Sequence, residues 1–281
     1  MPHSFDVPAP AKINLFLHVT GKRADGYHTL QSLMVFADAG DTLTFTEQDV
    51  FTVETAGPFA AALPETGGNL VTRAAVLLAA EYGVPLRGRI TLMKNLPVAS
   101  GIGGGSADAA AALRGLARLW NLPEDAPRLQ KPALKLGADV PACVVSRAVF
   151  ASGIGEILAL APDMPPLHLL LVNPGVPAPT AEVFKKFSGV FGAPAAVPEK
   201  ITLAWIAAQR NDLSDAAIAH VPEIRDVLRG LAQTEGCLLR RMSGSGATCF
   251  GIYADAAAAK KAAAVLSAAH PHWWIKAARG A

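Results

Sequence analysis

The chain has 281 residues, of which 51% are hydrophobic and 17% are charged, and its formal net charge is +2. This length suits one large or two modest globular domains, and the composition excludes a disordered chain. The basic residues are scattered along the sequence, so nucleic-acid binding, which depends on concentrated cationic charge, has little support.

The sequence lacks the features expected of membrane and secreted proteins. No apolar run reaches the ~18 to 20 residues of a membrane span, and the opening stretch MPHSFDVPAP has neither the basic nor the apolar region of a secretory signal. Cys143, Cys237 and Cys249 are far apart and fit neither a disulfide framework nor a zinc site. We therefore expect a soluble, cytoplasmic protein.

The first half of the chain mixes predicted strands and helices. Residues 12–19, KINLFLHV, alternate in the manner of a half-buried strand, which places Lys12 and Asn14 on one face. The following elements are a strand at 42–46, a helix at 69–83 ended by Gly83, a strand at 89–93, a helix from the glycine loop to about Trp120, and a proline-broken helical stretch that stops at Gly137.

The second half predicts a compact α+β unit. A change of domain is expected in the proline-rich stretch NPGVPAPT (173–180). The expected elements are strands joined by a turn over 141–158, a strand at 167–172, helices at 200–209 and 223–234, a strand to Met242, the turn SGSG, a strand at 247–253, an alanine-lysine helix at 256–270 and a last strand near 272–276.

The stretch LPVASGIGGGSADAAAAL (96–113) is a glycine-rich loop between a predicted strand and a predicted helix. Glycines let the backbone approach a ligand closely, and the helix start points N–H groups at the loop, so together they favour an anion site. The loop fits neither the Walker pattern nor the dinucleotide pattern, because Ser106 and Ala107 stand where those motifs need other residues. A plain connection capped by Ser106 is the alternative. Asp108 would repel a phosphate unless it points aside or toward a metal.

The loop resembles the second motif of the kinase superfamily named for galactose, homoserine, mevalonate and phosphomevalonate. PAKINLFLHV (10–19) and MSGSGATCFGIY (242–253) resemble its first and third motifs, in the same order. The resemblance implies an α+β fold with an N-terminal α/β nucleotide-binding domain over 1–160, a C-terminal ferredoxin-like domain over 161–281, and the active site between them.

Three further stretches are similar to the superfamily members that act on a cytidine diphosphate-linked polyol: GKRADGYHTLQS (21–32), LGADVP (136–141) and NPGVPAPTAEVF (173–184). The resemblance implies ATP and Mg²⁺ as cofactors, a small-molecule substrate, no nucleic-acid or membrane partner, and a monomer or homodimer. No metal ligand is identifiable. The alternatives are another kinase of the superfamily, for homoserine or mevalonate, and a non-catalytic RNA-binding module.

The same resemblance assigns the catalytic roles. It implies that Asp139 is the base that takes the proton of the substrate hydroxyl, and that Lys12 lies beside it, where a cation keeps Asp139 ionised and offsets charge on the phosphoryl oxygens. A turn or capping role for Asp139 and a solvent-exposed place at the end of a strand for Lys12 are the alternatives.

The resemblance also assigns the binding residues. Tyr27 and Phe184 would stack on the cytosine ring while His28 bonds its edge; a surface position for Tyr27 and a core position for Phe184 are the alternatives. The other expected substrate contacts are Asn14, Thr180, Gly244, Ser245 and Gly246, although a tight hairpin also explains the last three. The expected ATP contacts are Asn69, Lys94, Pro97, Gly101, Gly103, Gly104, Gly105 and Ser106.

Overall fold

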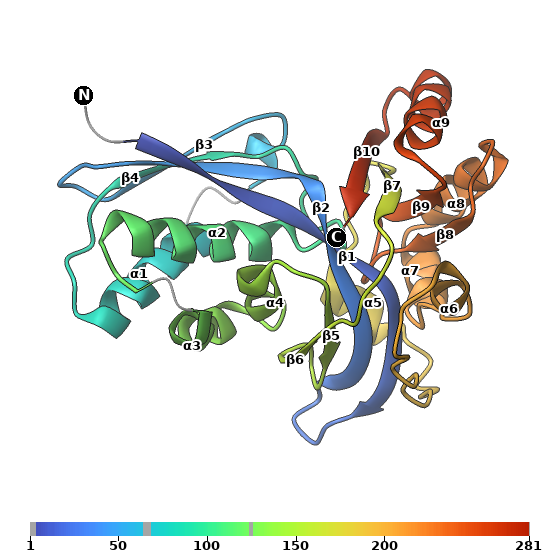
Figure 1. Cartoon of the computed structure of the whole chain (residues 1–281), viewed down its shortest axis with the longest axis horizontal. Coiled ribbons are helices and arrows are strands. Elements are labelled where there is room, and N and C mark those ends of the chain that lie inside the picture. The colour runs from blue at the N-terminus through green and yellow to red at the C-terminus, as the bar shows by residue number, and fades with distance from the viewer. Residues whose placement is uncertain (1–3, 64–68, 124–125, 281) are drawn as a thin grey trace. The chain divides into compact units, whose positions relative to one another are not determined.

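A computed structural model describes residues 4–63, 69–123 and 126–280 of the chain (Figure 1). Contacts divide the chain into two compact units that interleave along the sequence. Unit 1 comprises Met1–Ala11, Gly40–Val98 and Gly103–Ser146, and unit 2 comprises Lys12–Ala39, Ala99–Ile102 and Arg147–Ala281. The long strands β1 (Ser4–Lys22) and β2 (His28–Thr46) contribute residues to both units. The domain division at residues 160 and 161 stays a prediction.

Unit 1 is a sheet covered by helices. Its strands are the first part of β1, the last part of β2, β3 (Thr52–Ala56) and β4 (Arg89–Met93). Strand β4 runs antiparallel to β2 and parallel to β3. The helices are the 3₁₀ helix η1 (Ala60–Ala62), α1 (Leu70–Tyr82), α2 (Gly104–Leu119), α3 (Ala126–Leu136) and α4 (Val140–Val145). Figure 1 shows α1 to α4 on one side of these strands.

The core of unit 1 depends on the small side chains of α2. The alanines from Ala109 to Ala112 are fully buried. Since alanine side chains are small, the helix can lie close to the elements that cover it. The closest approach is at Gly115, where an added Cβ would lie 2.1 Å from the ring of Phe45. The alanine-rich sequence after the loop therefore codes for an interior helix.

Unit 2 is built on an antiparallel sheet. The first part of β2 continues through β10 (Trp274–Gly280), β7 (Leu167–Asn173), β9 (Cys249–Tyr253) and β8 (Leu239–Met242). Strand β5 (Val149–Ser152) pairs with β2 and with β6 (Ile157–Leu160). The helices are α5 (Thr180–Lys185), α6 (Leu203–Ala207), α7 (Ser214–His220), α8 (Glu223–Gln233) and α9 (Ala256–Ala269).

The core of unit 2 forms between this sheet and its helices. Strand β7 supplies Leu170 and Val172, and α8 supplies Ile224, Val227 and Leu231, all of which are buried in one cluster. Because the apolar residues of α8 recur every three or four positions, one stripe of the helix faces the sheet. The polar face of α8 is left to solvent.

The predicted α+β fold class is confirmed. The predicted helix at 69–83 is α1, whose N-cap Asn69 accepts a hydrogen bond from Val71 N over 2.9 Å and whose C-cap Gly83 has a φ of 64°. Strands at 12–19, 42–46, 89–93 and 167–172 are confirmed within longer or matching strands. Residues 124–125 of the predicted proline-broken stretch lie outside the described residues.

One alternative and one prediction from the sequence are wrong at the level of local structure. The N-cap of α2 is Gly103, with a φ of 63°, so Ser106 lies inside the first turn and does not cap it. Residues 141–145, expected as a strand, form most of α4. Pro141 suits the first turn of a helix, and so short an apolar run has no period that separates strand from helix. Within the described part of the chain, none of the helices combines the length and apolar character that a membrane crossing requires.

Candidate active site

The glycine loop reaches unit 1 at the start of helix α2. Gly103, the last residue of the loop, is the N-cap of α2 and has no side chain that could bond the first N–H groups of the helix. Gly105 is exposed and Ser106 partly exposed, whereas Pro97, at the start of the loop, is buried. Backbone donors and the positive end of the helix dipole are therefore presented together, which is an arrangement that fits phosphate oxygens.

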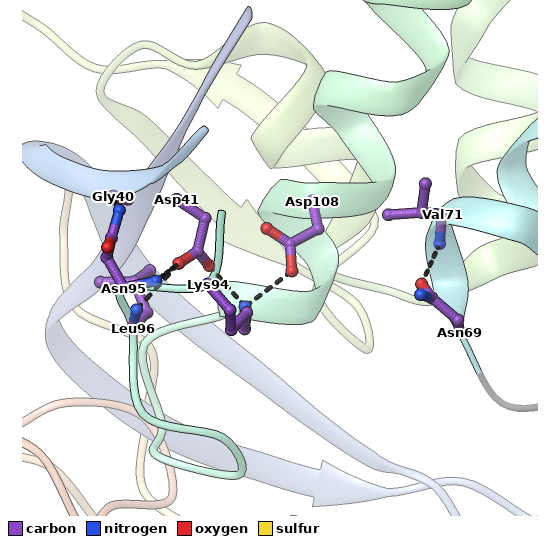
Figure 2. A network of polar contacts seen from close by, with 8 residues as sticks. All are labelled: Gly40, Asp41, Asn69, Val71, Lys94, Asn95, Leu96 and Asp108. Atoms are coloured by element: carbon purple, nitrogen blue, oxygen red, sulfur yellow. Dashed lines mark hydrogen bonds and ion pairs between the residues drawn. The ribbon is translucent and has the colours of Figure 1, made fainter. Parts of the chain in front are cut away.

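A buried ion triad lies directly behind this helix start (Figure 2). The ammonium of Lys94, which follows β4, donates to Asp108 Oδ2 over 2.6 Å and also bonds Asp41 Oδ2. At most 4% of any of these three side chains is exposed. Asp108 thus points aside to Lys94, which resolves how a carboxylate can follow the glycine loop. The predicted ATP contact of Lys94 stays a prediction, but its ammonium faces two carboxylates.

Burial and charge set the pKa values in the triad. Burial raises the pKa of Asp108 to about 7, aided by the negative charge of Asp41 and opposed by Lys94. The two carboxylates raise the pKa of Lys94 although burial alone would lower it. Asp108 Oδ1 is buried and has no hydrogen-bond partner among the described residues. A proton on Oδ1 would therefore break no hydrogen bond of that atom.

Two other predicted residues of unit 1 have defined local positions. The side-chain oxygen of Asn69 caps α1 (Figure 2). Asp139 occupies the N-cap position of α4, yet its side chain makes no capping hydrogen bond, and the residue is half-buried. The Asp139 side chain therefore does not cap α4 by a hydrogen bond.

Lys12 and Asn14 share one face of β1 in unit 2, as predicted. Lys12 Nζ donates to Asn14 Oδ1 over 2.7 Å, and Asn14 Nδ2 donates to Ser32 Oγ over 2.7 Å. Only 4% of Lys12 is exposed, which excludes the solvent-exposed alternative. The hydrogen bond to Asn14 fixes where the Lys12 charge is held. The predicted approach of Lys12 to Asp139 stays a prediction.

Residues from all three motifs meet within unit 2. The backbone N–H of Lys12 donates to the carbonyl of Ile102 over 2.9 Å. The backbone N–H of Asn14 donates to Ser243 Oγ, which in turn donates to the carbonyl of Gly101, each over 3.0 Å. Segments that are far apart in the sequence are therefore joined by hydrogen bonds at one place.

The predicted turn between β8 and β9 lies against the loop. Gly244 and Gly246 have φ values of 54° and 84°, and an added Cβ on Gly101 would lie 2.5 Å from the carbonyl of Gly246. Thr180 Oγ1 and Ser245 Oγ are 2.9 Å apart and share a hydrogen bond. This packing brings four predicted loop residues and Thr180 into one small region of unit 2.

An aromatic cluster surrounds His28. Its ring stacks on Phe184, with centroids 5.0 Å apart and planes 21° apart, and Phe187 lies edge-on at 5.7 Å. Burial and the nearby charge of Lys22 lower the pKa of His28, which favours a neutral imidazole. Tyr27 is 61% exposed. The ring that stacks on Phe184 is therefore that of His28, whereas the Tyr27 side chain is largely open to solvent.

Sequence reasoning missed the polar residues that support these sites. Asn211 Nδ2 donates to the carbonyls of Met242 and Gly244, each over 2.8 Å, and so holds the second glycine turn. Ser32 Oγ accepts a hydrogen bond from Asn14, and Asp41 accepts one from Lys94, so each holds a predicted site residue in place. No local pattern marks these residues, since each partner is distant in the sequence. Among the described residues no cluster of three or more His, Cys, Asp or Glu side chains could hold a metal ion.

Comparisons with known proteins add to this geometry. The models of the GHMP kinase N-terminal and C-terminal domains match residues 69–147 and 201–272. The 4-diphosphocytidyl-2-C-methyl-D-erythritol kinase of Paramagnetospirillum magneticum is 52% identical over 97% of both chains. The chain belongs to this kinase family. The 4-diphosphocytidyl-2-C-methyl-D-erythritol kinase of Parvibaculum lavamentivorans is 51% identical to this chain over 95% of both chains.

Solved structures agree with the family. A crystal structure of 4-(cytidine 5'-diphospho)-2C-methyl-D-erythritol kinase has a TM-score of 0.82 and 33% identity, and covers 99% of this chain and 100% of its own. Homoserine kinase from Cytophaga hutchinsonii has a TM-score of 0.71 at 17% identity over 98% and 94% of the two chains, and shares the fold. The resemblance deduced from three motifs is confirmed, and the chain is a GHMP kinase, a nucleotide-binding transferase.

Proposed function

We propose that this family member transfers the γ-phosphoryl group of ATP to the 2-hydroxyl of 4-diphosphocytidyl-2-C-methyl-D-erythritol. The observation that carries the proposal is that relatives bearing this substrate in their name share about half of their residues with nearly the whole chain. The reaction would serve non-mevalonate isoprenoid synthesis in the cytoplasm. Homoserine, mevalonate and RNA then serve as the competing ligands in a test.

ATP would bind with its phosphates at the glycine loop. The uncapped start of α2 and the exposed Gly105 support this, because backbone N–H groups bind phosphate without adding charge. Mg²⁺, which takes one or two protein ligands and several phosphate oxygens in such enzymes, would neutralise the phosphates. No side chain is assigned to it.

Asp139 would act as the base and Lys12 as the cation in a direct in-line transfer. The hydroxyl oxygen bonds to phosphorus as its proton passes to the Asp139 carboxylate, and the bond between the γ-phosphorus and the bridging oxygen breaks to release ADP. The partly buried position of Asp139 directly before α4 and the fixed ammonium of Lys12 support these roles. No covalent enzyme intermediate is required.

The cytosine end of the acceptor would bind at the aromatic cluster around His28. Phe184 offers the face on which the base stacks, and Tyr27 supplies a second aromatic surface. Because the His28 ring covers the face of Phe184, it must turn aside to bond the edge of the cytosine. Asn14, Thr180 and the turn residues Gly244 to Gly246 would contact the polyol diphosphate.

The test is ADP release by the purified protein with ATP, Mg²⁺ and each candidate acceptor in turn. We expect turnover with 4-diphosphocytidyl-2-C-methyl-D-erythritol and background rates with homoserine and mevalonate. Asp139→Asn should lower kcat by about 10² to 10⁴-fold and still bind ATP. Asp49→Asn, at an exposed aspartate of the same unit, is the matched control and should retain the wild-type rate. Turnover with another alcohol, or salt-sensitive RNA binding without turnover, would overturn the proposal.

A further inference from the structure

We propose that the Asp41–Lys94–Asp108 triad positions the phosphate-binding loop, so that Lys94 and Asp108 affect nucleotide binding through the loop without touching the nucleotide. The inference rests on the proposed use of ATP. It replaces the predicted nucleotide contact of Lys94 with a positioning role.

The triad ties the two ends of the loop to one ammonium group (Figure 2). Asp41 Oδ1 accepts hydrogen bonds from the backbone N–H groups of Asn95 and Leu96, over 2.5 and 2.8 Å, just before the loop begins. Asp108 lies on α2, just after the loop ends. Because Lys94 bonds both carboxylates, the distance between the two ends of the loop is fixed.

The loop also packs directly on the ammonium. A Cβ added to Gly104 would lie 3.2 Å from Lys94 Nζ and 3.6 Å from Leu96 Cβ. The glycine at this position therefore leaves the space that the lysine fills. A movement of the ammonium toward Gly104 would therefore press on the first residue of α2.

Direct contact of Lys94 with a nucleotide is disfavoured by its surroundings. Its side chain is 2% exposed, and its backbone N–H and carbonyl are bonded to Ala56 and Phe59 over 2.7 and 3.2 Å. Two of the three ammonium donors are already bonded to buried carboxylates, which leaves little of the ammonium for a nucleotide. The triad carries a negative net charge with both carboxylates ionised and no net charge with Asp108 protonated, so attraction of phosphate does not explain its position behind the loop in either state.

Two substitutions at one position separate the tether from the charge. Asp108→Leu removes the link between α2 and Lys94 but leaves Lys94 paired with Asp41, whereas Asp108→Asn keeps an oxygen that accepts from Lys94. The matched control is Lys131→Met, which breaks an exposed ion pair with Glu81 in the same unit. If Asp108→Leu does not fold, Asp108→Ala takes its place.

Each variant is measured in two ways: calorimetric binding of a non-hydrolysable ATP analogue with Mg²⁺, and backbone hydrogen exchange of residues 95–105 without nucleotide. We expect Asp108→Leu to weaken binding by about tenfold or more and to speed exchange in the loop. Asp108→Asn and Lys131→Met should stay within about threefold of wild type. Adding Lys94→Met to Asp108→Leu should cost much less than Lys94→Met alone, because both break one network.

Three results would overturn the inference: unchanged binding and exchange in Asp108→Leu, an equal loss in Asp108→Asn, or the same loss from Lys94→Met in both backgrounds. The first result would show that Asp108 does not tether the loop. The second would show that the effect depends on the charge of Asp108, and the third that Lys94 contacts the nucleotide directly. A wild-type protein that binds no ATP analogue would instead overturn the proposed function, while loop exchange would still decide whether the triad positions the loop.

Discussion

Among the side chains that the structure describes, the imidazole of His18 is buried. Neither ring nitrogen has a partner among the described residues, and the ring lies 4.8 Å from that of Phe16. Burial lowers the pKa of His18, the charges of Arg210 and Arg241 lower it further, and Asp212 opposes them. A lowered pKa in the folded state means that stability is present above the unfolded pKa and is lost as the pH falls through the folded value.

We therefore predict that His18→Leu raises the melting temperature, since a buried unsatisfied polar group costs about 1–3 kcal/mol. The gap to wild type should widen as the pH falls below about 6.5, because only the wild type must then bury or expel a charged imidazole. Thermal unfolding at several pH values measures both effects. His272→Leu, at an exposed histidine, should show no such gap, and a gap independent of pH would contradict the account.

The raised pKa of Asp108 predicts a different pH dependence. The unfolded carboxyl titrates near 3.8 and the folded one near about 7, so the folded state binds more protons between these values. The stability contributed by Asp108 should therefore fall as the pH rises through this window, by up to about 1.4 kcal/mol per pH unit. Denaturant unfolding of wild type and Asp108→Asn tests this, because the wild type should lose stability relative to the uncharged variant as the pH rises through this window. Parallel pH curves would contradict it.

At the level of the elements, the approach of α2 to β2 sets a steric limit. An added Cβ at Gly115 would overlap the ring of Phe45, and overpacking of this kind costs about 1–3 kcal/mol, more than the helix propensity that alanine gains. We predict that Gly115→Ala lowers the melting temperature and that Phe45→Leu in the same chain recovers part of the loss. Gly137→Ala, where a Cβ meets only Val140 at 3.8 Å, is the control. Equal stability of the two alanine variants would exclude the steric explanation.

The turn between β8 and β9 depends on one distant side chain. Asn211 donates to the carbonyls of Met242 and Gly244 and accepts from Leu213 N. Asn211→Asp would keep the acceptor but set a carboxylate against two carbonyls, so it should raise KM for the acceptor at least as much as Asn211→Ala. Steady-state kinetics with the acceptor varied gives the comparison. A milder effect of Asn211→Asp than of Asn211→Ala would show that these donated bonds do not hold the turn.

How far an element could be predicted depended on how local its signals are. The cap residues Asn69 and Gly83 stand at the ends of α1, and their neighbours in sequence suffice to place the helix. The N-cap of α2 was missed because several glycines compete for the left-handed position. Helix α4 was missed because six residues are too few to show a period.

For the molecule as a whole, the three motifs predicted the α+β fold and the kinase family, because glycine loops and strand patterns are readable in one sequence. The supporting contacts were not readable. Asn14 bonds Ser243, which is 229 positions away, and Lys94 bonds Asp41, which is 53 positions away. Such pairs depend on the folded chain, so the sequence alone indicated neither Asp41 nor the ion triad that holds Lys94.

The proposed reaction is the phosphorylation of one hydroxyl of a cytidine diphosphate-linked polyol by ATP. The most direct measurement is phosphorus NMR of wild-type protein incubated with ATP, Mg²⁺ and 4-diphosphocytidyl-2-C-methyl-D-erythritol. We predict equal amounts of ADP and of a new phosphomonoester on the 2-hydroxyl, with the diphosphate link intact, and formation of both products about 10² to 10⁴-fold more slowly with Asp139→Asn. ADP without a new phosphomonoester, or a phosphate on a different oxygen, would contradict it.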